Sequence, residues 1–135
     1  MSDKDVLIDT SVWVDYFRGK GGEAGRAVDG LLDADRVLVL PLIEAELYRG
    51  ARTEKELKFL EGHFSFLRQL DIPAGFWRKV GRFSWQLSRK GYLPHLVDAF
   101  IALTAIENGV MVFSRDNDFK KIAALSELKL FVSPP

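Results

Sequence analysis

The sequence of 135 residues contains no cysteine and only two histidines. Disulfide bonds and thiolate metal sites are therefore excluded. No apolar run approaches the ~20 residues that a membrane-spanning helix requires. The start MSDKD is acidic, whereas a secretory signal peptide begins with basic residues. These absences favour a soluble cytoplasmic protein without a membrane partner.

A net charge is also absent, because 19 basic residues balance 19 acidic ones. The total charge therefore neither favours nor excludes a nucleic-acid partner. The charges are unevenly placed, however, and residues 76–91 contain five basic side chains and no acidic one: Arg78, Lys79, Arg82, Arg89 and Lys90. These side chains are candidates for binding the phosphates of a nucleic acid, and a solvated helix face explains them equally well.

The order of apolar segments predicts a single domain over residues 1–135. Unbroken apolar runs indicate strands that are buried on both faces. The candidate strands are residues 6–8, 36–41, 70–73, 110–113 and 128–132. Helical apolar spacing separates these runs, which predicts an α/β fold with three layers, α/β/α, around a mostly parallel central sheet of four to five strands.

Local signals predict where the helices begin and end. Thr10 or Ser11 is expected to cap the helix that follows the first strand. Residues 19–25, GKGGEAG, have the composition of a loop. Gly109 is expected to end a helix over residues 97–108.

The tryptophans and histidines receive structural interpretations. Trp13, Trp77 and Trp85 lie in apolar helical patterns, which favours packing in the core or at a dimer interface over stacking on bases. We expect His63 at the surface and His95 at a partly exposed helix start.

Carboxylates follow two of the predicted strands. Asp9 comes directly after the first strand, and Asp116 comes shortly after the strand VMVF. In a parallel sheet both residues lie at the carboxyl edge, where ligands bind near the point at which the strand order reverses. Glu46, in the helix after the second strand, and Asp98, at the start of a later helix, can reach the same edge.

Four gathered carboxylates repel one another, so they must take up protons or bind a cation. Oxygen ligands select a hard ion such as Mg²⁺ or Mn²⁺. Such an ion polarises a phosphoryl oxygen and activates water, which predicts a metal-dependent phosphodiesterase. Taken singly, each residue also has a structural explanation. Asp9 and Asp98 suit helix starts, Glu44 is a second glutamate beside Glu46, and RDND is a common turn sequence.

Four segments of the chain resemble PIN-domain ribonucleases, specifically the VapC-type toxins of bacterial and archaeal toxin–antitoxin pairs. They are VLIDTSVWVDYFRG, LPLIEAELYRGA, LPHLVDAFIALTAIENG and VFSRDNDFKKI, in the order found in that family. The resemblance implies a PIN-like fold and a catalytic quartet of Asp9, Glu46, Asp98 and Asp116. Within this quartet it implies that Asp9, Asp98 and Asp116 are metal ligands. Further candidates for the site are Asp118, Thr10, Ser114 and Arg115.

The resemblance also implies an activity and partners. Similar proteins are Mg²⁺- or Mn²⁺-dependent endoribonucleases that form homodimers and are inhibited by a cognate VapB-like antitoxin. Two other classes are compatible with the residues: a catalytically silent PIN-like module that binds RNA or protein, and a receiver-like or phosphatase-like domain with Asp9 as phosphoryl acceptor. The intact quartet disfavours the first, and the absence of an aspartate two residues after Asp9 disfavours the second.

Overall fold

The structure is a computed structural model that describes residues 4–19 and 22–133. Its sheet has the strand order β3-β2-β1-β4, and all three neighbouring pairs are parallel. The strands are β1 Val6–Ile8, β2 Val37–Val39, β3 Arg68–Gln69 and β4 Met111–Phe113. Leu7 pairs with Leu38 on one side and with Val112 on the other. β1 is thus a central strand, and its three apolar residues are fully buried.

The described part of the chain contains seven helices. They are α1 Thr10–Phe17, α2 Gly22–Asp33, α3 Pro41–Arg49, α4 Glu54–Phe64, α5 Phe76–Arg89, α6 Leu96–Asn108 and α7 Asp118–Ala124. Within residues 4–19 and 22–133, no helix is both long and apolar enough to cross a lipid bilayer.

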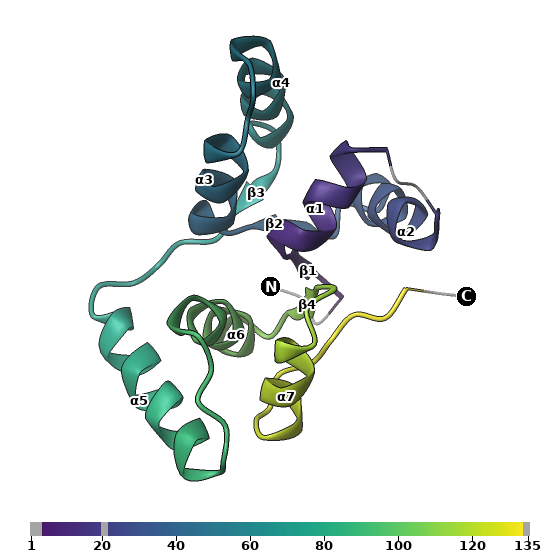
Figure 1. The fold of residues 1–135 in the computed structure, drawn as a ribbon. Helices are drawn as coiled ribbons and strands as arrows, with labels where there is room; N and C mark the ends of the chain where they lie inside the picture. The colour runs from purple at the N-terminus through teal and green to yellow at the C-terminus, as the bar shows by residue number, and fades with distance from the viewer. Residues whose placement is uncertain (1–3, 20–21, 134–135) are drawn as a thin grey trace.

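The helices form two groups. α1 packs against α2 and α3, and α3 packs against α4, whereas α6 packs against α5 and α7. Figure 1 shows α1 to α4 in the upper half of the view and α5 to α7 in the lower half. The chain moves across the sheet in one direction from β1 to β3 and then crosses back to β4. Right-handed crossovers therefore place the two groups on opposite faces, which agrees with the predicted α/β/α layers.

Local sequence explains several helix boundaries. Pro41 occupies the first turn of α3, where its missing N–H costs no hydrogen bond. α6 ends at Gly109 in the left-handed conformation, with φ +66°, as the sequence predicted. At the start of α4, the Thr53 hydroxyl accepts a hydrogen bond of 3.0 Å from the Glu56 N–H.

Two of the predicted strands are wrong in extent. β3 is Arg68–Gln69 rather than residues 70–73. The Leu70 N–H still donates to the Val39 carbonyl at 2.8 Å, but Pro73 has no N–H with which to continue the ladder. Residues 128–132 form a single bridge, from Leu130 to Val112, instead of a strand, since their backbone hydrogen bonds to β4, from the Val112 N–H to the Lys129 carbonyl and from the Phe131 N–H to the Val112 carbonyl, involve one β4 residue.

Two boundary predictions near the N-terminus are also corrected. Neither Thr10 nor Ser11 caps α1: the N-cap is Asp9, and both hydroxyls form other hydrogen bonds in the candidate site. The predicted loop at residues 19–25 is shorter, because α2 already begins at Gly22. Residues 20 and 21 of that predicted loop lie outside the described part of the chain.

The aromatic residues divide between the core and the surface. Trp13 is fully buried, as predicted for core packing. His63 is partly buried rather than at the surface, because its ring centroid lies 5.7 Å from that of Trp13 and 5.1 Å from that of Phe17. Trp77 and Trp85 are 52% and 58% exposed, so neither belongs to the core.

Candidate metal centre

The sheet brings the ends of β1 and β4 together. The strand order reverses between these strands, so their carboxyl ends flank the position at which open α/β sheets bind ligands. The Asp9 N–H donates to the Phe113 carbonyl at 2.9 Å, which holds the two ends in contact. Asp9 and the turn containing Ser114 and Asp116 therefore occupy the same edge.

The Asp9 carboxylate is held by two hydroxyl groups. Its Oδ2 accepts hydrogen bonds from Ser114 Oγ at 2.8 Å and from Ser11 Oγ at 3.0 Å. The residue is only 9% exposed, and these bonds offset part of the cost of burying its charge. Oδ1 forms no hydrogen bond with any described residue, so one oxygen stays free to bind a cation.

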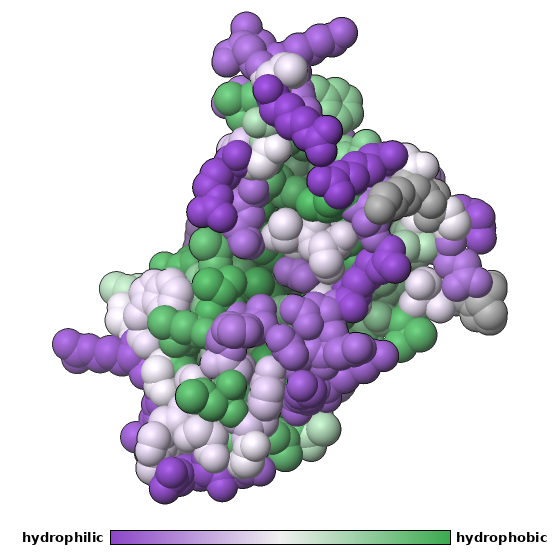
Figure 2. All heavy atoms as spheres, viewed as in Figure 1, coloured by the Kyte–Doolittle hydropathy of each residue, from purple (hydrophilic) through white to green (hydrophobic). Residues whose placement is uncertain are grey.

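Three further carboxylates converge at this edge, and Asp9 lies outside the set whose oxygens are within 4.8 Å of one another. Asp98 lies in the first turn of α6, Asp116 in the turn after β4, and Asp118 at the start of α7. One oxygen from each lies within 4.8 Å of the other two. The Asp118 N–H also donates to Asp116 Oδ1 at 2.9 Å, which fixes the turn. Figure 2 shows a hydrophilic surface over the start of α7, where this cluster lies.

The electrostatics of the cluster favour a positive partner. Burial, followed by the negative charges of Asp116, Asp9 and Asp118, raises the pKa of Asp98 to about 6. Burial and the Asp118 carboxylate likewise raise the pKa of Tyr92. Both shifts show that this edge disfavours additional negative charge, and a divalent cation would remove that penalty.

Glu46 is not a member of this cluster and is held by a different contact. Its Oε1 accepts a hydrogen bond of 3.0 Å from Thr10 Oγ1, which places its carboxylate beside the start of α1. Glu44, on the same helix, instead accepts a hydrogen bond from Gln69 at the sheet edge. Tertiary contacts therefore distinguish the two glutamates.

Arg115 is engaged within the protein. Its guanidinium forms an ion pair with Asp15 of α1, and its backbone N–H donates to Ser11 Oγ at 3.1 Å. The structure thus shows this candidate site residue in an ion pair with a neighbouring carboxylate. The two contacts connect the turn after β4 to α1.

Several residues of the site were not found from the sequence. Ser11 was considered only as a helix cap, although it bonds to Asp9. Lys121 pairs with Asp118 at 3.7 Å and lies 5.4 Å from the ring centroid of Tyr92. Tyr92 and Lys121 lie 29 positions apart (121 − 92), and no spacing pattern connects them.

Some of the basic side chains in and beside α5 already have partners within the protein. Lys79 pairs with Glu107 at 3.0 Å, Lys90 donates to the Leu125 carbonyl at 2.9 Å, and the Arg89 guanidinium lies 5.8 Å from the Trp85 ring centroid. The side chains of two members of the set, Arg78 and Arg82, form no ion pair or hydrogen bond with a described residue. Contact of this face with RNA stays a prediction.

Comparison with known proteins identifies the family. The profile of the PIN domain matches residues 6–125. The chain belongs to the PIN domain family. Within that family, Ribonuclease VapC11 of Mycobacterium tuberculosis is 30% identical over 128 residues, which are 92% of this chain and 96% of the relative. A VapC ribonuclease of Mycobacterium bovis has the same identity and coverage. This PIN domain is therefore a member of the VapC group.

Solved structures support the PIN fold independently. VapBC2 of Rickettsia felis, bound to a DNA fragment from its promoter, aligns with a TM-score of 0.76 at 19% identity and covers 93% of this chain and 96% of its own. DNA-bound VapBC of Salmonella typhimurium aligns with a TM-score of 0.75 at 22% identity, over 94% and 96%. At these identities the alignments establish the fold.

Proposed function

We propose that this PIN domain is a Mg²⁺- or Mn²⁺-dependent endoribonuclease that acts as the toxin of a type II toxin–antitoxin pair. The observation that carries the proposal is the convergence of Asp98, Asp116 and Asp118 at the edge of the sheet where Asp9 also lies, close enough for the charge of Asp9 to act on Asp98. Ribonuclease activity is named for its VapC relatives. We assign Asp9, Asp98 and Asp116 as metal ligands and Glu46 as a further ligand or base.

The donor set fits a hard divalent ion. All the candidate ligands are carboxylate oxygens, and those of Asp98 and Asp116 lie within 4.8 Å of each other and of an Asp118 oxygen. Such an ion, when bound, would polarise a phosphoryl oxygen and lower the pKa of a water molecule. Ser11 and Ser114 orient Asp9 for this site, while Thr10 orients Glu46.

The protein's own side chains prepare the site in other ways. Lys121 shields the charge of Asp118, which limits the repulsion among the carboxylates. The pair between Arg115 and Asp15 fastens the turn that carries Asp116 to α1. These contacts give a rigid set of oxygens whose spacing does not have to be created during the reaction.

Partners and location belong to the same proposal. We assign RNA as substrate, a VapB-like antitoxin as inhibitor and a second copy of the chain as dimer partner. Antitoxin binding is supported by the similar solved structures, which are VapBC assemblies. The proposed site of action is the cytoplasm, where RNA and antitoxin are both present.

The test is cleavage of total cellular RNA by the purified protein, freed of co-purifying partners, with Mg²⁺, with Mn²⁺ and with EDTA. Asp9→Asn and Glu46→Gln should lose discrete cleavage. The matched control is Glu44→Gln, because Glu44 lies on the same helix but is bound to Gln69. A folded Asp9→Asn protein with wild-type activity would refute the site. RNA binding without cleavage in any metal would instead favour the silent binding module.

A further inference from the structure

A groove of about 580 Å³ lies between α1, α3 and the start of α4, and one end of it is formed by Glu46. We call it the Arg18–Arg52 groove. Its apolar lining includes Val14, Phe17, Leu47 and Leu60. In Figure 2, apolar surface is visible between the α3–α4 pair and α1, with hydrophilic side chains on both sides. Phe59 lies on the rim with 60% of its surface exposed.

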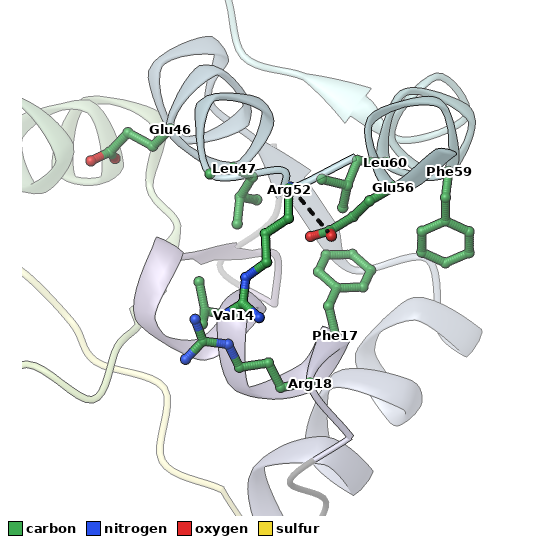
Figure 3. Close-up of a pocket in the computed structure, with 10 residues that line it drawn as sticks. Val14, Phe17, Arg18, Glu46, Leu47, Arg52, Glu56, Phe59 and Leu60 are labelled. Carbon is green, nitrogen blue, oxygen red and sulfur yellow. Dashed lines mark hydrogen bonds between the residues drawn. The ribbon is translucent and has the colours of Figure 1, made fainter. Parts of the chain in front are cut away.

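Two guanidinium groups enter this groove without a partner. Figure 3 shows the side chains of Arg18, which directly follows α1, and Arg52, from the segment before α4, extending into the groove toward each other. Neither guanidinium forms an ion pair or a hydrogen bond with any described residue. The two positive charges repel each other across the space that they share. An anion bound between them would attract both and so offset this repulsion.

The two carboxylates of the groove do not neutralise these arginines. Glu46 bonds to Thr10, and its carboxylate points away from the groove in Figure 3. Glu56 accepts a hydrogen bond from the Arg52 backbone N–H at 3.4 Å, in the first turn of α4, where the helix dipole favours a negative charge. The positive charge of the groove is therefore available to a ligand.

We infer that the Arg18–Arg52 groove binds a single-stranded segment of the RNA substrate, with both arginines on backbone phosphates and Phe59 stacked on a base. The inference rests on the proposed function, because it extends the same site along the substrate. Proteins bind single-stranded nucleic acids through a positively charged groove and aromatic side chains, and both elements occur here. Because Glu46, which we assign to the proposed site, also lines the groove, an RNA strand bound there would run past that glutamate.

This groove also solves an electrostatic difficulty of the site. The carboxylate cluster repels RNA phosphates, so attraction must come from neighbouring cations. Arg115 is paired with Asp15, which leaves it unable to supply that attraction without breaking the pair. Arg18 and Arg52 lie on the other side of Glu46 and carry no such pairing.

The test measures binding of a fluorescein-labelled single-stranded RNA to full-length protein that carries Asp9→Asn, so that the RNA stays intact. Arg18→Gln with Arg52→Gln should weaken binding about tenfold. It should also reduce the slope of log K against log salt concentration by about 1.4, or about 0.7 for each phosphate that is no longer neutralised. The matched control is Arg26→Gln with Arg49→Gln, two exposed arginines outside the groove, which removes the same charge.

The stacking contact has its own pair of variants. Phe59→Ala should weaken RNA binding about tenfold, whereas Phe66→Ala, which removes a 90% exposed phenylalanine outside the groove, should leave it unchanged.

The outcomes separate the inference from the proposed function. If the wild type cleaves RNA but the Arg18 and Arg52 variant binds RNA as tightly as its parent, the inference alone is overturned. Absence of both RNA binding and cleavage in the wild type would overturn the proposed function as well. Arginine-dependent binding of a glutamate-rich peptide, without any effect on RNA, would make the groove a protein-docking surface and overturn the RNA assignment.

Discussion

Ser114 donates a 2.8 Å hydrogen bond to Asp9 across 105 positions of the sequence. The bond joins the ends of β1 and β4 through their side chains, in addition to the backbone bond from Asp9 to Phe113. Ser114 Oγ also accepts a hydrogen bond from the Asp116 N–H at 3.0 Å. One hydroxyl group thus orients one candidate metal ligand directly and fixes the backbone of a second.

Ser114→Ala should therefore impair metal binding while preserving the fold. Loss of an outer hydrogen bond to a metal ligand typically costs about 10–100-fold in metal affinity or activity. Mn²⁺ titration and RNA cleavage measure the two effects. Ser88→Ala is the control, because among the described residues the Ser88 hydroxyl bonds only to the Trp85 carbonyl on α5. Equal Mn²⁺ affinity in both variants would show that Ser114 does not position the ligands.

Asp98 gives the metal-free protein a specific dependence on pH. Its pKa is raised from 3.8 to about 6, chiefly by burial. The folded state therefore holds this proton more tightly than the unfolded chain does, and the resulting stability is present below pH 3.8 and lost as the pH rises through about 6. In EDTA, Asp98→Asn should be more stable than the wild type at pH 7, with a smaller difference at pH 5.

Urea unfolding of both proteins at the two pH values measures this difference, and saturating Mg²⁺ should favour the wild type because a bound ligand stabilises the folded state. Glu44→Gln serves as a carboxylate control outside the cluster. A constant difference between wild type and Asp98→Asn at pH 5 and pH 7 would contradict the electrostatic explanation.

The edge that carries the candidate site was predictable from the sequence because its signals are local. An unbroken apolar run that stops at Asp9, and another followed by Asp116, place both residues beyond the carboxyl ends of parallel strands. The choice between Glu44 and Glu46 was not predictable from spacing, since the contacts that separate them, to Gln69 and Thr10, are tertiary.

The errors in the predicted fold have a related cause. Leu70 is buried and apolar, which made residues 70–73 resemble a strand, but β3 consists of Arg68 and Gln69, both exposed and polar. A strand at the edge of a sheet can thus form where the sequence shows no apolar periodicity. Likewise, Ser11 has the sequence signature of a helix cap, but its hydroxyl donates to the Asp9 carboxylate and accepts from the Arg115 N–H, a tertiary contact with the turn after β4.

The start of α4 offers a test of local stability. The Thr53 hydroxyl satisfies the Glu56 N–H, one of the unpaired donors at a helix N-terminus. Thr53→Ala should lower the free energy of unfolding by about 1 kcal/mol, and Thr53→Ser should restore most of it. Urea denaturation at neutral pH measures both. Unchanged stability in Thr53→Ala would mean that the cap contributes nothing in this protein.

His63 provides a last prediction, in which the sign is opposite to that of Asp98. Its ring packs among aromatic side chains, and burial lowers its pKa from 6.5. The unfolded chain therefore binds this proton more readily, and the stability that neutral His63 contributes is complete above pH 6.5 and lost as the pH falls below it. Replacement by a side chain that cannot ionise, His63→Phe, should reduce the loss of stability between pH 7 and pH 5. Parallel stability curves for the wild type and His63→Phe would show that protonation of His63 is not coupled to unfolding.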